Sequence, residues 1–373
     1  MVESLQFEYR GGPGMNAFLI LENGTVFTGR SIGSEQEVIS EIVFNTSMTG
    51  YLEVLSDPSY AGQAVVMTYP LIGNYGINKD DMESRRAWPD GFIVREAARM
   101  PSNFRSQGTL RDFLTEQGIT GICGIDTRAL TRILREAGTM NGMITTNENF
   151  DLQEVLPRIR EYKQENVVGR TTCLKPRVLP GSGYRVALMD FGAKENIARS
   201  LNQLGCEVHI FPAYTTAREV LEINPDGIML SNGPGDPKDC GSIISEVRNL
   251  SNSGVPIFAI CLGHQLMALA HGADTVKLKY GHRGGNHPVK DLETGKVYIS
   301  SQNHGYVVQQ ETMDPEIAVP SFINVNDRTN EGMSYLKKPV YTVQFHPEAC
   351  PGPRDSHFLF ERFLHMMEVK KNA

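Results

Sequence analysis

The chain has 373 residues, of which 40% are hydrophobic and 21% charged, and its formal net charge is -7. These values are typical of a soluble globular protein, and the length predicts two domains. An acidic chain without a cluster of Lys and Arg offers no surface for the phosphates of a nucleic acid, so we expect no nucleic-acid partner.

Neither a secretion signal nor a membrane span is expected. Residues 1–15 contain no apolar run, and the longest strongly apolar stretch, Val255–Leu262, is far shorter than a bilayer span and contains Pro256. Without a secretory signal, the six cysteines are expected to be reduced thiols. The sequence therefore predicts a cytoplasmic protein that does not bind membranes.

The first part of the chain shows two different patterns. Residues 1–14 have no periodicity and end in a Gly/Pro cluster, so we interpret them as an extension outside the fold. Residues 15–150 begin like a β-hairpin with an Asn-Gly turn at 23–24, and they mix short strands with a few helices. The clearest helix is capped by Asp126 and stops at Gly138. We predict a smaller, mixed α/β domain over this range.

The second part of the chain has a different rhythm. Residues 151–183 carry charge and several prolines, a composition typical of a linker. From residue 184 onward, apolar strands alternate with helices, and the final third is rich in strands and ends in a helix. This pattern predicts an α/β domain over residues 184–373, with a mostly parallel sheet flanked by helices.

One cysteine lies at the junction of a predicted buried strand and a predicted helix. The run Val255–Ile260 has the length of a strand, and Cys261 is followed at once by a helical pattern that ends at Gly272. A helix amino terminus stabilises a thiolate, and the N–H of Leu262 has no acceptor inside the helix. The position suits a nucleophile on a sharp turn, although this pattern alone fits an inert buried cysteine equally well.

Two further segments carry polar groups or glycines next to predicted strands. His346 and Glu348 flank a proline at the end of a strand, and in extended chain residues i and i+2 point the same way. An imidazole that takes a thiol proton and a carboxylate that orients it would activate a cysteine. Alone, this pair fits a surface His beside an acid better, and the loop Gly233–Gly235 fits an ordinary turn better than a ligand cradle.

Taken together, three motifs resemble those of the triad-type (class I) glutamine amidotransferases: Ser231–Pro237, Cys261–Gln265 and His346–Glu348. Four segments resemble the small chain of carbamoyl-phosphate synthase more closely: Phe44–Tyr51, Gly281–Lys290, Ser301–Tyr306 and His346–Pro353. The resemblance runs from about residue 15 to the carboxyl terminus. It implies the amino-terminal domain of the small chain, followed along the sequence by a class I amidotransferase domain. Other triad amidotransferases lack the amino-terminal domain.

The resemblance implies a role for each matching residue. Cys261 would attack the side-chain amide of L-glutamine, His346 would pass a proton to the departing ammonia, and Glu348 would orient His346. The N–H groups of Gly233 and Leu262 would form the oxyanion hole. Contacts with the substrate are implied for Ser47, Gly233, Gly235, Leu262, Gln265, Asn303, Gly305 and Tyr306.

Three positions depart from the pattern of the family. Ala259 stands where Gly is usual, and its single methyl group is small enough for the tight turn. Cys350 stands where Ser is usual and adds an oxidisable thiol. Tyr306 replaces a common Phe and keeps the aromatic ring.

The resemblance also implies a partner. Ammonia would pass to a separate, ATP-using large chain, which forms a heterodimer with this one and makes carbamoyl phosphate from bicarbonate for arginine, pyrimidines or both. This sequence has no phosphate-binding loop, so we expect ATP and Mg on the large chain and no cofactor here. His282 and His287 suggest a metal, but no Cys or carboxylate completes a ligand set with them, so we expect no metal.

Three alternatives remain open at this point. The chain could be the glutaminase of another synthase, such as one that makes anthranilate or aminobenzoate, although the segment Phe44–Tyr51 argues against this. It could be a cysteine peptidase or γ-glutamyl hydrolase, which would not need such an amino-terminal domain. It could also be a non-catalytic regulatory partner, although all three triad residues are present.

Overall fold

The computed structural model describes residues 15–372 and divides the chain into two compact units, one ending at Glu165 and one starting at Asn166. Each unit has a sheet and hydrophobic clusters of its own. The extension expected over residues 1–14 lies outside the described residues.

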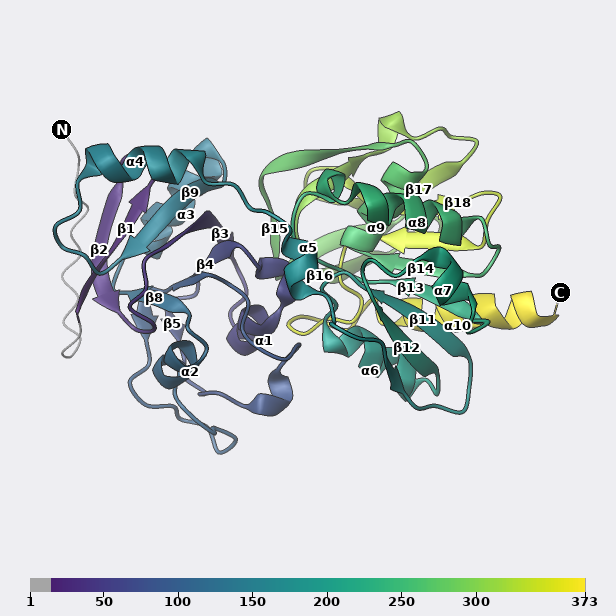
Figure 1. Ribbon diagram of the computed structural model, residues 1–373, viewed down its shortest axis with the longest axis horizontal. Helices are drawn as coiled ribbons and strands as arrows, with labels where there is room; N and C mark the ends of the chain where they lie inside the picture. The colour runs from purple at the N-terminus through teal and green to yellow at the C-terminus, as the bar shows by residue number, and fades with distance from the viewer. Residues whose placement is uncertain (1–14, 373) are drawn as a thin grey trace. The chain divides into compact units, whose positions relative to one another are not determined.

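A closed β-barrel forms the body of the first unit (Figure 1). Its strands follow the order β1, β2, β8, β6, β4, β3 and β9, and β9 pairs with β1 to close the barrel. In chain order the strands are β1 Asn16–Leu21, β2 Val26–Ser31, β3 Val38–Asn45, β4 Gln63–Met67, β6 Gly91–Ile93, β8 Thr120–Cys123 and β9 Met140–Thr145. A separate small sheet pairs β5 (Leu71–Ile72) with β7 (Glu96–Ala97).

Side chains of β1 alternate between two sides of the barrel wall, as extended chain requires. Leu19 packs with Leu130 of one helix, whereas Ile20 packs with Val155 of another. The helices and 3₁₀ turns of this unit are α1 Tyr51–Ser56, η1 Pro58–Tyr60, η2 Lys79–Asp81, α2 Leu110–Glu116, α3 Thr127–Ala137 and α4 Leu152–Glu161.

Two local predictions for this unit are confirmed. Strands β1 and β2 form the expected antiparallel hairpin around the turn at 23–24. The carboxylate of Asp126 accepts hydrogen bonds of 3.0 Å from the N–H groups of Arg128 and Ala129, and α3 ends before Gly138, whose φ of 105° suits glycine.

The range 151–183 differs from the expected linker. It contains α4, α5 (Val167–Thr171) and β10 (Arg177–Leu179), and the boundary between the two units falls inside it, after Glu165. Helix α4 is retained because Val155 and Ile159 are buried against the barrel, in spite of Pro157 inside the helix. Strand β10 belongs to the sheet of the second unit. The segment with this composition thus contains secondary structure on both sides of the boundary between the units.

The second unit is built on one large sheet, in the order β10, β12, β11, β13, β14, β19, β18, β17, β15 and β16 (Figure 1). The neighbours β12, β11, β13, β14 and β19 are parallel, and the remaining pairings are antiparallel. The strands not yet placed are β11 Arg185–Asp190, β12 Glu207–Pro212, β13 Gly227–Leu230, β14 Ile257–Ile260, β15 Asp274–Asp291, β16 Val297–Gln309, β17 Ala318–Asn324, β18 Asn330–Tyr335 and β19 Val340–Val343. The expected parallel sheet is thus its centre, and the strand-rich final third extends it with antiparallel strands.

Helices cover both faces of the parallel centre. Along β11, Val186 belongs to a cluster with residues of α6 and α10, and Ala187 belongs to a second cluster with residues of α7, α8 and α9. Successive strand residues point to opposite faces, so the two sets of helices lie on opposite sides of the sheet. The helices and 3₁₀ turns are α6 Glu195–Gln203, α7 Ala217–Leu221, η3 Pro237–Asp239, α8 Gly241–Ser251, α9 Leu262–Ala270, η4 Gln310–Thr312 and α10 Phe358–Asn372.

The register of the parallel strands brings the sequence motifs to one edge. Leu230 of β13 is paired with Ala259 of β14, and Ile260 of β14 is paired with Val343 of β19. The segments that begin at Ser231, at Cys261 and after Val343 therefore leave the sheet at the carboxyl ends of three adjacent strands. Ligand sites of open α/β sheets lie at this edge.

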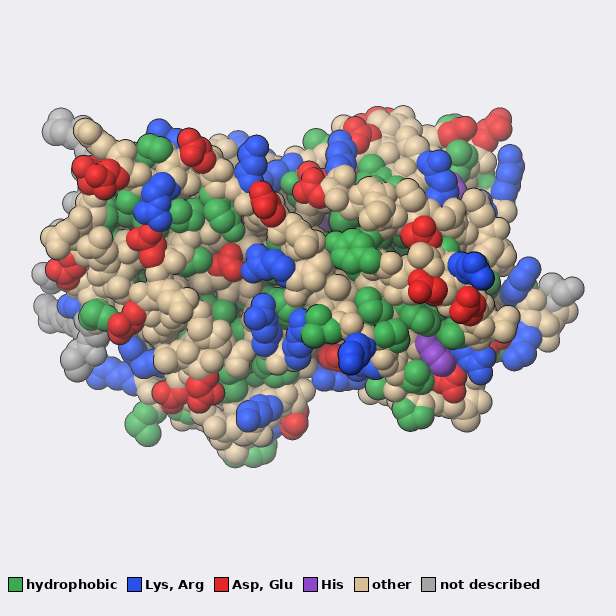
Figure 2. Space-filling model, in the orientation of Figure 1, with side chains coloured by type: hydrophobic (Ala, Val, Ile, Leu, Met, Phe, Trp, Pro, Cys, Tyr) green, Lys and Arg blue, Asp and Glu red, His purple; other side chains and the backbone are tan. Residues whose placement is uncertain are grey.

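Within residues 15–372, no helix combines the length and the apolar character that a membrane crossing requires. On the face shown in Figure 2, acidic and basic side chains both occur on each unit.

Candidate active site

Cys261 lies on the predicted sharp turn between β14 and α9. Its φ of 52° and ψ of -105° are unusual for a residue with a side chain, and such strain is typical of functional positions. The turn is held by its backbone: the N–H of Cys261 donates to the carbonyl of Val343 at 2.8 Å, and the N–H of Gly263 donates to that of Ser231 at 3.0 Å. These bonds fix the nucleophile between the adjacent strands.

The small residues around Cys261 are required by close packing. A Cβ atom on Gly263 would lie 2.6 Å from the carbonyl oxygen of Leu230. Ala259, where glycine is usual, is fully buried in β14 and keeps its pairing with Leu230 and Thr342 of the neighbouring strands. Helix α9 can approach β13 closely enough to form the turn because residue 263 has no side chain.

His346 and Glu348 form the expected pair. The Nδ1 atom of His346 lies 2.6 Å from Oε1 of Glu348, and both side chains are buried. The Nε2 atom of His346 makes no hydrogen bond of good geometry within the described residues, yet the Cys261 thiol is near enough to contribute to raising the pKa of His346. The thiol, the imidazole and the carboxylate therefore lie in the order that nucleophile activation needs.

A buried lysine, which the sequence analysis missed, completes this arrangement. The Nζ atom of Lys194 lies 2.9 Å from Oε1 of Glu348 and also donates to the carbonyl oxygens of Ala349 and Cys350. Its own backbone N–H is held by the side chain of Asn232 at 3.0 Å. The available signal was its position: Lys194 follows β11, another parallel strand that ends at the same edge of the sheet.

The charges of Lys194, His346 and Glu348 explain the pKa values of the imidazole and the carboxylate. Burial by itself lowers the pKa of His346, but the Glu348 carboxylate more than offsets this and raises the pKa to about 10, against an opposing effect of Lys194. Burial by itself raises the pKa of Glu348, but the positive charges of Lys194 and His346 lower it to about 2. The imidazole is thus a strong base, and the carboxylate beside it stays ionised.

Two backbone donors lie close to the nucleophile. The N–H groups of Gly233 and Leu262 have no acceptor within residues 15–372. A Cβ atom on Gly233 would lie 2.7 Å from Cδ2 of Leu262 and 2.4 Å from the carbonyl oxygen of Phe191, so the loop after β13 lies directly against the start of α9. Free N–H groups at such a place suit a developing oxyanion.

The residues implied to contact the substrate fall into two groups. Those of β16 lie beside the nucleophile: the Cys261 thiol donates to the carbonyl of Asn303 at 3.7 Å. The side-chain amide of Gln265 donates to the carbonyl of Tyr306 at 2.9 Å, so α9 and β16 are joined next to Gly305. For Gly235 the structure shows a φ of 92° and a close approach to Val167.

Ser47 belongs to the first unit. It follows β3 in the first unit, where its N–H donates to the side chain of Asn45 at 2.7 Å. Its implied contact with the substrate stays a prediction.

The histidines near the motifs differ in their surroundings. His264 is buried in α9 and its Nδ1 lies 2.7 Å from Oγ1 of Thr342, so it has a structural role. The argument against a metal at His282 and His287 does not hold in the folded chain. A carboxylate, that of Glu331, lies 3.6 Å from His282 although it is distant in sequence.

Two family profiles match this chain. The family described as "Carbamoyl-phosphate synthase small chain, CPSase domain" matches residues 19–144, which lie in the first unit. The family described as "Glutamine amidotransferase class-I" matches residues 187–366, which lie in the second unit and include the whole triad.

Sequence similarity to known proteins extends over nearly the whole chain. A "Carbamoyl phosphate synthase small chain" of Listeria innocua is 50% identical over 356 residues, which cover 95% of this chain and 98% of the relative. Proteins of the same name from Clostridium perfringens and Bacillus caldolyticus are 50% and 52% identical, over 94% of this chain and 99% and 96% of their own lengths. The similarity therefore includes both units in their observed order.

Proposed function

This chain belongs to the family of carbamoyl-phosphate synthase small chains, and we propose that it hydrolyses L-glutamine through a thioester on Cys261. The observation that carries the residue assignment is the strained turn that holds the Cys261 thiol beside the buried pair His346 and Glu348. Neither another synthase's glutaminase nor a stand-alone hydrolase accounts for the match over residues 19–144.

The first half of the reaction forms the thioester. Nε2 of His346 holds the proton given up by the Cys261 thiol, and the sulfur attacks the amide carbon of glutamine. The N–H groups of Gly233 and Leu262 stabilise the oxyanion of the tetrahedral intermediate. His346 then returns the proton to the nitrogen as the C–N bond breaks, and ammonia leaves.

The second half releases glutamate. Water attacks the thioester and gives a proton to His346, a second oxyanion forms in the same place, and the C–S bond breaks, which restores the sulfur beside the protonated imidazole. Throughout, Glu348 holds the imidazole through Nδ1 and stabilises its positive charge, and Lys194 keeps the carboxylate ionised. Gln265, Asn303, Gly305 and Tyr306 are proposed to hold the substrate beside the nucleophile.

The remaining parts of the proposal concern the other chain. These steps need no cofactor in this chain, and we place ATP and Mg on a large synthase chain that forms a heterodimer with it in the cytoplasm. That chain combines the ammonia with activated bicarbonate to give carbamoyl phosphate. Neither a nucleic acid nor a membrane takes part in this reaction.

A glutamine analogue with an electrophilic ketone in place of the amide tests the nucleophile. One equivalent is expected to modify Cys261 and to abolish glutamine hydrolysis, as peptide mass mapping and a rate assay would show. The chain offers internal controls, because burial raises the pKa of Cys173 to about 12, of Cys206 to about 11 and of Cys240 to about 12, which leaves them poor nucleophiles. Modification mainly at Cys350 or Cys206 would overturn the assignment.

A further inference from the structure

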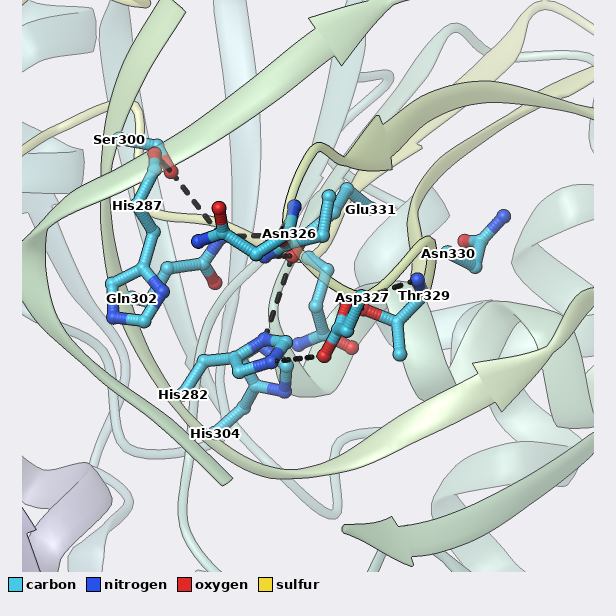
Figure 3. Close-up of polar contacts among 12 residues, drawn as sticks. His282, His287, Ser300, Gln302, His304, Asn326, Asp327, Thr329, Asn330 and Glu331 are labelled. Atoms are coloured by element: carbon cyan, nitrogen blue, oxygen red, sulfur yellow. Dashed lines mark hydrogen bonds and ion pairs between the residues drawn. The ribbon is translucent and has the colours of Figure 1, made fainter. Parts of the chain in front are cut away.

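Three residues from three strands of the second unit bring potential metal ligands together in its interior. They are His282 of β15, His304 of β16 and Glu331 of β18, and their ligand atoms all lie within 4.8 Å of one another. All three side chains are buried, and Figure 3 shows them facing one another between the strands. None of them takes part in the proposed hydrolysis of glutamine.

His304 presents a nitrogen that lacks a hydrogen-bond partner. Its Nδ1 lies 2.7 Å from the carbonyl oxygen of Tyr306, so the ring proton belongs on Nδ1. Its Nε2 is therefore left with a lone pair, and this buried atom has no hydrogen-bond partner within the described residues. A histidine whose other ring nitrogen donates to a backbone carbonyl is oriented in the same way as metal-ligating histidines.

In His282, too, one ring nitrogen is held by a neighbour, here a carboxylate, and the other has no hydrogen-bond partner among the described residues. Its Nε2 lies 2.7 Å from Oδ2 of Asp327, which fixes the ring and places a proton on Nε2 (Figure 3). Its Nδ1 is buried without a hydrogen-bond partner and lies 3.6 Å from Oε1 of Glu331, too far for a hydrogen bond. Two ligands of one tetrahedral zinc ion, each about 2.1 Å from the metal, are separated by roughly 3.4 Å, which is close to this distance.

Glu331 is also held in place by neighbours. Gln302 donates to its Oε2 and Asn324 donates to its Oε1, both at 2.9 Å. Each of the three side chains thus has a partner that orients it and an atom that faces the other two. A cluster whose polar groups served only to bond with each other would not leave both Nδ1 of His282 and Nε2 of His304 without partners.

We propose that His282, His304 and Glu331 bind a divalent transition-metal ion of the zinc type, with water as a fourth ligand. Two imidazoles and one carboxylate suit zinc better than calcium or magnesium, which prefer oxygen ligands. The ion stabilises β16 beside the nucleophile. His304 follows Asn303, whose carbonyl accepts from the Cys261 thiol, and its ring donates to Tyr306, whose carbonyl also accepts from Gln265. The role of the metal ion is structural, because Cys261, His346 and Glu348 carry out the hydrolysis.

Metal binding can be measured without any assay of activity. The full chain is freed of metal with a chelator and titrated with Co²⁺, whose tetrahedral complexes absorb visible light, and Zn²⁺ is then used to displace it. The Cys261→Ala variant serves as the background, so that the triad thiol does not bind the probe. We expect one equivalent of Co²⁺ to bind, and Glu331→Gln or His304→Gln to weaken binding by about 100-fold or more.

A matched control uses another histidine beside a carboxylate. His209 lies 2.6 Å from Glu207 near the surface, and His209→Asn is expected to leave the affinity for Co²⁺ unchanged. Failure of the chain to bind a stoichiometric amount of Co²⁺ or Zn²⁺ would overturn the proposal, as would binding that both cluster variants leave intact.

Crystals of the wild-type chain grown with Zn²⁺ give a test that no folding defect can obscure. An anomalous peak is expected between Nδ1 of His282, Nε2 of His304 and Oε1 of Glu331. If that position shows no peak and His282 is instead hydrogen-bonded to Glu331, the cluster is an ion pair and the metal site does not exist.

Discussion

Lys194 places a positive charge 2.9 Å from the carboxylate of Glu348 in the interior of the second unit. Substitution Lys194→Met removes that charge and leaves the buried carboxylate with His346 alone. Loss of one partner from a buried ion pair typically costs about 3–5 kcal/mol, so we expect unfolding in urea at a clearly lower concentration. The rate of glutamine hydrolysis is also expected to fall, because the imidazole loses a fixed orientation.

Lys175→Met is the matched control for this prediction. Lys175 is exposed, and its substitution is expected to change the free energy of unfolding by less than about 0.5 kcal/mol. Equal stabilities and equal rates for the two variants would show that Lys194 does not support the pair.

The raised pKa of His346 predicts a dependence of stability on pH. The folded chain keeps a proton on this imidazole up to a pH of about 10, whereas the unfolded chain releases it near 6.5. Above 6.5 the folded state binds more protons, so this contribution is complete below 6.5 and is lost as the pH rises toward 10. The stability difference between wild type and His346→Asn, measured in urea at pH 7, 8 and 9, should therefore shrink by at most about 1.4 kcal/mol per pH unit. A difference independent of pH would contradict the assignment.

At the scale of single elements, the start of α9 depends on the absence of a side chain at Gly263. Alanine normally favours a helix by about 0.8–1 kcal/mol over glycine, but a Cβ atom here would lie 2.6 Å from the carbonyl of Leu230. We expect Gly263→Ala to destabilise the chain by about 1–3 kcal/mol and to displace Cys261, with a loss of glutamine hydrolysis. Thermal unfolding and a rate assay would measure both effects.

Gly241, the first residue of α8, gives the comparison. A Cβ atom added there meets no other atom within 4 Å, so Gly241→Ala is expected to leave stability unchanged or to raise it slightly. If both substitutions stabilise the chain, helix propensity rather than the contact with β13 decides the outcome at position 263.

Local signals in the sequence predicted those elements whose cause is local. The Asn-Gly hairpin, the helix capped by Asp126 and the strand–Cys261–helix turn all follow from neighbouring residues, and the structure contains each of them. Helix α4 escaped notice because burial of Val155, a tertiary effect, outweighs the proline that the local pattern emphasises.

At the scale of the whole molecule, the candidate active site and the histidine cluster are assembled by contacts between residues far apart in sequence. The triad was found because the family pattern supplied what spacing could not. Lys194 and Glu331 were missed because each meets its partners only when parallel or antiparallel strands align. Sequence spacing is informative inside one element, whereas a cluster assembled from several strands becomes visible only in the fold.

The division of labour between two chains gives the last prediction, which separates the chemistry of glutamine from that of ammonia. Because the thiol triad lies in this chain and no phosphate-binding loop does, Cys261→Ala should abolish glutamine-dependent synthesis of carbamoyl phosphate by the reconstituted pair. Synthesis from added ammonium should stay nearly intact, since ammonia reaches the site of the large chain without help from the triad.

The wild-type small chain alone should hydrolyse glutamine slowly and accelerate when the partner turns over ATP, because a partner that favours an active state shifts its population. A tenfold acceleration needs a difference in affinity of only about 1.4 kcal/mol between the two states. Three mixtures decide the matter: the wild-type pair, the Cys261→Ala pair and the wild-type small chain alone, each with glutamine or with ammonium. The separation of tasks is wrong if the Cys261→Ala pair assembles but uses neither nitrogen source. It is equally wrong if the lone wild-type chain is already a fast glutaminase that no partner affects.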